Sequence, residues 1–322
     1  MRFIAAFSVW LPRAVLTLAA IGLLNFALIR LAPGEPAAVI AGESGAADAA
    51  FIEKIRKDYG LDQPMHLQVA RYLGRLAMLD LGVSYRSNQP VATMIGERVP
   101  ATLALTGSAF LLALLLGTTL GVISARARGR WGEALIGSAA MLFYAMPVFW
   151  VGLVLVLVFS VGLDWFPAFG MMSLIPKQGG ARILDILHHL ALPALTLALL
   201  HLAVYVRLAR ASTLEVLGRD FVRTAYSKGL AEVQVMRGHV LRNSLLPTVT
   251  MAGLQIGHLV GGAVVVETVF AWPGIGRLAF DALLQRDYAV ILGVFFVSSV
   301  IVVLANLVTD IALRLVDPRI GH

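Results

Sequence analysis

Six long stretches without a single charged residue dominate this sequence. They cover residues 14–29, 99–125, 134–163, 186–206, 243–266 and 288–309. A helix needs about 20 apolar residues to cross a bilayer, and a charged side chain in the bilayer core is costly. None of the stretches alternates with the period of two that a barrel strand requires. The sequence therefore predicts an all-α polytopic membrane protein with six transmembrane helices.

The composition supports this class and excludes others. Charged residues make up only 14% of the 322 residues, and the mean hydropathy is +0.83. Soluble domains are about a quarter charged, and a disordered chain is far less apolar. The absence of cysteine excludes disulfides, thiol nucleophiles and Cys-ligated zinc. The excess of 26 basic over 19 acidic residues does not indicate a nucleic-acid partner, because in a membrane protein the placement of charge matters more than its sum.

The connections between the stretches predict the orientation. Loops 125–132 and 207–242 carry ten arginines and lysines, whereas loops 164–185 and 267–287 carry four. Basic residues concentrate on the cytoplasmic side. We therefore expect the first two loops and both termini in the cytoplasm.

This orientation divides the chain into three parts. Residues 1–30 form the N-terminal cytoplasmic end and the first span, which we expect to stay uncleaved because the following residues are a poor signal-peptidase site. Residues 31–98 form an external, mostly helical cap, with helices predicted over 51–60 and 66–79. Residues 99–322 form a five-helix transmembrane core with a cytoplasmic loop at 207–246.

The loop 207–246 is the most informative part of the chain. Gly229 can take the left-handed conformation that ends a helix, and Pro247 suits the first turn of the next span. The pattern predicts a short helix, a glycine break, a second helix and a span that begins near Leu246. Such a body suits docking into a groove on another protein; the alternative is an ordinary solvated basic loop. A short apolar face is expected from five residues: Phe221, Val222, Ala225, Tyr226 and Leu230.

Two motifs in this loop, residues 223–230 and 241–247, resemble the coupling-loop motif of ABC importer permeases. The resemblance is closest to the B-type permease of the dipeptide/oligopeptide/nickel group. Further matches follow the family's order along nearly the whole chain, at residues 33–36, 59–64, 80–85, 99–103, 261–277, 286–288 and 317–319. Two departures stand out: Arg223-Thr224 replaces the Glu-Ala that opens the general family signature, and Gly238 stands where an arginine is expected.

The resemblance implies the fold of a type I ABC importer permease and a multi-pass location in the bacterial inner (plasma) membrane. Implied partners are a second homologous permease, two cytoplasmic ABC ATPases, an external substrate-binding protein and membrane lipid. The loop 212–246 would couple the chain to the ATPases, through Phe221, Arg223, Thr224, Ala225, Lys228, Gly229 and Leu230. The cargo would be peptides or, alternatively, nickel or a metal chelate.

No catalytic activity, cofactor or nucleic-acid partner is expected. The chain has no Gly-x-x-x-x-Gly-Lys-Ser/Thr loop, so the partner subunits would hydrolyse ATP. A secondary transporter driven by an ion gradient would need paired helix interruptions in 99–163 and 243–315, which the sequence does not indicate. An intramembrane enzyme would need a motif such as His-Glu-x-x-His or Gly-x-Ser-x-Gly, and neither occurs.

Polar residues inside a membrane are functional candidates. Gln255 and His258 share a helix face and are expected to line the translocation pathway, or else to hydrogen-bond the sister permease. No metal site is expected, because no second ligand residue stands at suitable spacing. His188 and His189 are expected to form an interfacial pair.

Other residues receive structural roles. Glu267 is expected to cap a returning helix over 275–285 or to pair with a basic group. Asp310 is expected either to act with Asn306 at the inner end of the last span or to pair with Arg314. The glycines at 117, 121, 253, 257 and 261 are expected to let helices approach closely. The full structural set is Leu246, Pro247, Glu267, Trp272, Pro273, Gly274, Asn306 and Asp310.

Overall fold

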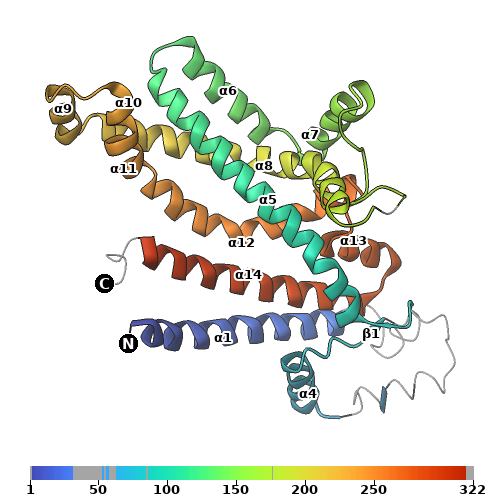
Figure 1. The fold of residues 1–322 in the computed structure, drawn as a ribbon. Coiled ribbons are helices and arrows are strands. Elements are labelled where there is room, and N and C mark those ends of the chain that lie inside the picture. Colours follow the sequence, from blue (N-terminus) through green and yellow to red (C-terminus); the bar gives the residue numbers. More distant parts are fainter. Residues whose placement is uncertain are drawn as a thin grey trace. The chain divides into compact units, whose positions relative to one another are not determined.

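A computed structural model describes residues 2–31, 53, 56–57, 63–84, 86–175 and 177–316, and nearly all of them are helical (Figure 1). The longer helices are α1 (Arg2–Leu31), α4 (Met65–Ala77), α5 (Val91–Arg126), α6 (Trp131–Ala145), α8 (Gly180–Leu217), α12 (Leu246–Val269), α13 (Ile275–Gln285) and α14 (Tyr288–Val316). Shorter ones are α7 (Val148–Leu155), α9 (Asp220–Ser227), α10 (Glu232–Val235) and α11 (Arg242–Ser244), with π-helical segments η1 (Val156–Gly162) and η2 (Met236–Leu241). The helical class is confirmed, with one small addition, a hairpin of β1 (Val83–Ser84) and β2 (Gln89–Pro90).

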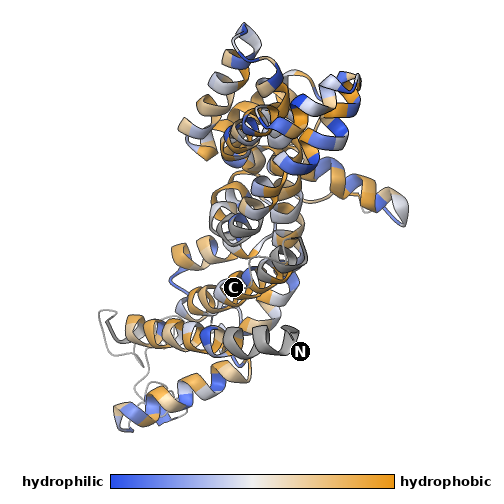
Figure 2. Cartoon of the chain, turned by 90° about the vertical axis from the view of Figure 1, so that its left-hand side faces the viewer, coloured by the Kyte–Doolittle hydropathy of each residue, from blue (hydrophilic) through white to orange (hydrophobic). Residues whose placement is uncertain are grey.

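Within the part of the chain that the structure describes, four helices are long and apolar enough to cross a membrane: α1, α5, α8 and α14. A fifth candidate is the pair formed by α6 and the α7–η1 segment, if the two are taken as one span. Hydrophobic residues dominate the long helices in Figure 2, and hydrophilic residues gather in turns and short helices. The predicted stretches 14–29, 99–125, 186–206 and 288–309 all lie within these helices. The predicted helix over 66–79 is confirmed as α4, and the one over 51–60 lies largely outside the described residues. Their external location stays a prediction.

The predicted third span, 134–163, is not one continuous helix. The chain breaks between Ala145 and Val148, and the two helical parts meet at a bend of 111°. Pro147 has no N–H to donate, and its ring disfavours the helical conformation at Met146, which is extended (φ −80°, ψ 144°). Pro147 instead starts α7, where its carbonyl accepts from Trp150 at 3.0 Å.

The described chain separates into two compact units. Unit 1 comprises Met1–Ala101 and Pro273–Leu307, and unit 2 comprises Thr102–Trp272 and Val308–His322. In unit 1, the start of α5 packs with α13 and α14 around a core that includes Val91, Ile95 and Leu278. The predicted division at residues 30 and 98 follows membrane topology rather than contacts and stays a prediction.

A buried carboxylate joins two distant motifs within unit 1. Ser84 Oγ donates to Asp287 Oδ2 at 2.6 Å, and the backbone N–H of Val290 donates to Asp287 Oδ1 at 3.2 Å. Asp287 therefore caps the N-terminus of α14 and holds the hairpin against it. The adjacent Arg286 takes a left-handed conformation (φ 59°) that ends α13 and allows this sharp turn.

In unit 2, α8 packs against α6, α7 and α12, and α5 approaches it very closely. A methyl group at Gly117 would lie 2.5 Å from Tyr205 Cβ, and one at Gly121 would lie 2.6 Å from the Val206 carbonyl oxygen. The expected packing role is confirmed for these two glycines. The surroundings of the glycines at 253, 257 and 261 lie outside the described part of the structure.

Gly121→Ala is expected to lower the free energy of unfolding by about 1–3 kcal/mol, because its methyl group meets the backbone of α8. Gly107→Ala is the matched control on α5, since a methyl there meets nothing within 4 Å. It should be neutral or stabilise by up to about 1 kcal/mol through helix propensity. Unfolding by dodecyl sulfate in mixed micelles measures both, and equal stability of the two variants would contradict the close approach.

Asp287→Ala is expected to cost about 1–3 kcal/mol, since it removes the α14 cap and leaves the Ser84 hydroxyl buried without its acceptor. Asp287→Asn keeps an acceptor for the cap and should lose less. Asp281→Ala, a half-exposed acid on α13, is the control. The same unfolding assay ranks the three variants, and a loss in Asp281→Ala as large as that in Asp287→Ala would refute the capping role.

Candidate functional site

The segment after α8 folds into a small helical body, residues 218–245, which we call the 218–245 body. α8 ends at Leu217, α9 follows, and Gly229 turns the chain with φ +78°. α10, η2 and α11 complete the body, and α12 then begins at Leu246 with Pro247 in its first turn. The predicted order of short helix, glycine break, second helix and proline-started span is confirmed.

A small apolar core holds the body together. Its buried members come from α9, α10 and η2: Val222, Ala225, Val235, Met236 and Val240. Val122 of α5 and Val216 and Leu217 of α8 pack against them. The body therefore packs against the ends of two long helices, α5 and α8.

The remaining apolar residues face outward. Phe221 and Tyr226 are each 44% exposed, Leu230 is 37% exposed and Val233 is 59% exposed. The expectation of one shared apolar face is therefore wrong, because Val222 and Ala225 turn into the core. One helical face packs inside and the other presents aromatic and aliphatic side chains to the surroundings. Arg223, Thr224, Lys228 and Gly229 are exposed as well.

Polar contacts fasten this region to its neighbours in unit 2. Arg126 Nη2, at the end of α5, donates to Glu232 Oε1 of α10 at 2.7 Å. Glu133 of α6 accepts from the Gly129 N–H at 2.6 Å and from Arg210 Nε of α8 at 2.9 Å. The ends of α5, α6 and α8 are thus tied to one another next to the body.

The structure shows the surroundings of Gly238, one of the two departures from the family motif. Gly238 lies in η2 with its surface exposed, and a Cβ there would meet nothing within 4 Å. An arginine at this position would therefore extend outward without disturbing the core. Its replacement by glycine removes a side chain from the surface of the body and leaves the fold intact.

The residues predicted for the pathway are not brought together as a described site. Gln255 is half-buried on α12, and the side chain of His258 lies outside the described residues. Among the described residues, no group of three His, Asp or Glu side chains is arranged to hold a metal ion.

Several residues predicted as structural have clear places. Glu267 is fully buried, and Thr102 Oγ1 donates to its Oε1 at 2.6 Å. The two roles predicted for Glu267 stay predictions. Trp272 is fully buried, and the returning helix over 275–285 is confirmed as α13 with Gly274 before its first turn. Asn306 is exposed on α14, and the Asp310 side chain lies outside the described residues.

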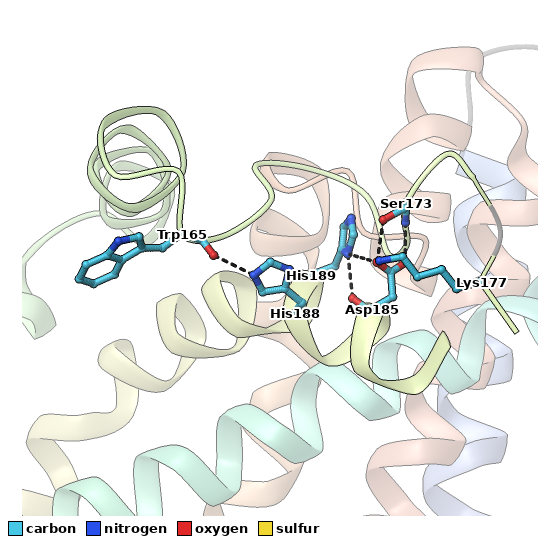
Figure 3. A network of polar contacts seen from close by, with 6 residues as sticks. All are labelled: Trp165, Ser173, Lys177, Asp185, His188 and His189. Atoms are coloured by element: carbon cyan, nitrogen blue, oxygen red, sulfur yellow. Dashed lines mark hydrogen bonds and ion pairs between the residues drawn. The ribbon is translucent and has the colours of Figure 1, made fainter. Parts of the chain in front are cut away.

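Sequence reasoning missed a second polar site at the start of α8. Asp185 is buried and accepts from the N–H and Oγ of Ser173 and from Lys177 Nζ (Figure 3). His188 Nε2 lies 2.7 Å from the Trp165 carbonyl oxygen. His189 Nδ1 contacts the Asp185 carbonyl oxygen at 2.8 Å, and the rings of His188 and His189 meet edge to face with their centroids 6.4 Å apart. Their expected location at the membrane interface stays a prediction. The sequence offered one hint, a single acid at the edge of a charge-free stretch.

Known protein families match the chain over nearly its whole length. The model of the binding-protein-dependent transport system inner membrane component matches residues 117–322, and the model of the N-terminal part of such components matches residues 1–106. The di/tripeptide transport system permease protein DppB of Pseudomonas aeruginosa (strain UCBPP-PA14) is 41% identical over 315 residues, covering 93% of this chain and 94% of the relative. The oligopeptide transport system permease protein AppB of Bacillus subtilis (strain 168) is 40% identical, covering 94% of each.

A solved structure shares the fold. An inward-facing structure of the MetNI methionine ABC transporter superposes with a TM-score of 0.57 at 17% identity, covering 71% of this chain and 98% of the other. The relatives and both family models agree with the resemblance found in the motifs. The chain therefore belongs to the family of binding-protein-dependent transport system inner membrane components, the permease subunits of ABC importers.

Proposed function

We propose that this chain forms half of the translocation pathway of a peptide importer and that the 218–245 body is the site at which ATPases drive it. The observation that carries the proposal is the two-sided body, with a packed core beneath and the exposed side chains of Phe221, Tyr226, Leu230 and Val233 outside. Exposed aromatic and aliphatic residues on an ordered surface are the usual anchors of a protein interface. Arg223, Lys228 and Gly229 complete the proposed docking surface, and Ala225 supports it from within.

The substrate class rests on the relatives. Their names describe permeases for di/tripeptides and for oligopeptides. We infer peptides for this chain as well, with nickel or a metal chelate as the alternative. The partners would be a second homologous permease, two cytoplasmic ABC ATPases and an external substrate-binding protein.

Six spans follow if the bent α6–α7 pair counts as one and α12 is added. α12 has 24 residues. It is thus about 36 Å long, enough to cross a hydrocarbon core of ~30 Å. The basic residues of 125–132 and 207–242 support a cytoplasmic location for the 218–245 body and both termini.

The contacts of the body suggest how movement would pass into the membrane. The body continues directly into α8 and α12, and Arg126 and Glu232 link it to α5. Glu133 and Arg210 link the start of α6 to α8. A displacement of the body by closing ATPases would therefore move the inner ends of several helices together, as a rigid-body switch of access requires. Gln255 and His258 are our proposed pathway residues on α12.

Phe221→Asp is expected to weaken binding of the ATPases roughly 30-fold, the effect of losing an anchor worth about 2 kcal/mol. Phe221 is half-exposed on α9, so the fold should survive. Met78→Asp is the matched control, because Met78 is 84% exposed and lies outside the body. Co-purification of the tagged chain with its ATPases in mild detergent, with thermal stability measured in parallel, makes the comparison. ATPases retained at the wild-type level by Phe221→Asp would refute the docking surface.

Transport by the complete importer in proteoliposomes tests the substrate class and the energy source. We expect uptake of a radiolabelled dipeptide that requires ATP and the binding protein. Uptake of Ni²⁺ without uptake of peptide would mean that nickel is the substrate of the same ATP-driven importer. Uptake that survives removal of the ATPases in the presence of an ion gradient would overturn the importer itself.

A further inference from the structure

Residues 163–187, which connect η1 to α8 and include its first turns, expose several large apolar side chains outside the long helices and on the first turns of α8. Leu174 is fully exposed and Ile175 is 82% exposed. Trp165, Phe169, Leu184 and Leu187 are each more than half exposed. Because burial of one such side chain is worth about 1.5–3 kcal/mol, an exposed group of this size indicates a surface that something covers.

This segment is held in place by specific contacts. Ser173 donates to Asp185 through its N–H at 2.7 Å and its Oγ at 2.6 Å, and Lys177 Nζ donates to the same carboxylate at 2.7 Å (Figure 3). These three donors fix the chain on both sides of Leu174 and Ile175. The apolar tip is therefore presented outward by an ordered loop.

Further contacts fix the first half of the segment. The Trp165 N–H donates to the Phe159 carbonyl at 2.9 Å, and the Trp165 carbonyl oxygen lies 2.7 Å from His188 Nε2. The Gly170 N–H donates to the Phe270 carbonyl at 2.8 Å. The exposed side chains are thus part of a defined surface of unit 2.

The covering medium can be identified from continuity and charge. The exposed Ile183, Leu184 and Leu187 lie on the first turns of α8, a helix long and apolar enough to cross a membrane. The bonds of Ser173 and Lys177 to Asp185 hold the loop that carries Leu174 and Ile175 against these turns. α8 has 38 residues. Its length of about 57 Å exceeds the hydrocarbon core of ~30 Å, so its ends reach into the headgroup layers.

Residue types at this end of α8 also suit the headgroup layer. Trp165 supplies the amphipathic aromatic ring that is enriched there, and the exposed Arg182 supplies a cation for lipid phosphates, whereas Lys177 is paired with Asp185. We propose that residues 163–187 lie in the interfacial layer of the membrane, with Leu174 and Ile175 inserted among the lipids where α8 begins. Asp185 is the positioning residue that holds the loop in this orientation.

The sequence itself provides a clean test, because it contains no cysteine. Leu174→Cys and Ile175→Cys, each made in the full-length chain, carry single nitroxide labels in nanodiscs of phosphatidylethanolamine and phosphatidylglycerol. Collisions with oxygen and with a water-soluble chromium chelate then report the depth of each label. We expect both labels to prefer oxygen and to lie about 5–10 Å below the headgroup boundary, the depth of an interfacial apolar face. A label at Ser227→Cys, exposed on the 218–245 body, should prefer the chelate.

Two results would overturn the proposal. Labels as accessible to the chelate as the Ser227→Cys label would mean that the surface is in water and awaits a soluble partner. Labels inaccessible to both reagents would mean that another protein chain covers it.

Asp185→Asn tests the positioning role in the same samples. Loss of the ion pair with Lys177 should increase the mobility of the Leu174→Cys label and reduce its depth. Asp164→Asn, an exposed acid in the same segment, is the matched control and should change neither quantity. A label at Leu116→Cys on α5 verifies that both variants stay folded, and an unchanged Leu174→Cys label in a folded Asp185→Asn variant would refute the role of Asp185.

Discussion

The contact between α5 and α8 at Gly117 and Gly121 is the constraint on which unit 2 depends. With no side chain at either position, the two backbones approach closely enough that even a methyl group would collide with α8. Lipid tails are as apolar as the helices themselves, so association within the membrane relies on such close packing. The contact aligns the ends of both helices, and the 218–245 body packs onto those ends through Val122, Val216 and Leu217. The contact between α5 and α8 therefore determines the position of the proposed coupling surface.

Much of this architecture could be predicted from the sequence because the bilayer imposes a simple rule. A long charge-free stretch inside a bilayer must satisfy its own backbone groups because no water is present, and a helix does so within one segment. The same simplicity applies to the 218–245 body, where Gly229 and Pro247 determine where helices end and begin. The helix boundaries near 275, 285 and 288 followed from similar local residues.

What the sequence could not predict depends on contacts between distant residues. Pro147 breaks a helix, yet Pro12, Pro100 and Pro193 are accommodated within α1, α5 and α8, so the residue type alone does not distinguish the cases. Val222 and Phe221 are neighbours of similar hydrophobicity, and only the position of the core shows which one turns inward. Asp287 binds Val290, three residues further along the chain, and Ser84, which is 203 residues away in sequence. The bond to Val290 follows the local rule for helix caps, whereas nothing local predicts the bond to Ser84.

Three acids near the starts of helices fix neighbouring parts of the chain in this fold. Asp185, Asp287 and Glu133 each accept hydrogen bonds from a turn or hairpin and lie at or near the start of a long helix. A carboxylate near a helix start is favoured by the helix dipole. Asp287 also accepts from an N–H of the helix that follows it, that of Val290, whereas Asp185 and Glu133 accept from N–H groups of the preceding connection. Each therefore holds a connection or hairpin against the start of a helix. A connection fixed in this way is expected to transmit a displacement, which the proposed drive by ATPases on the cytoplasmic side requires.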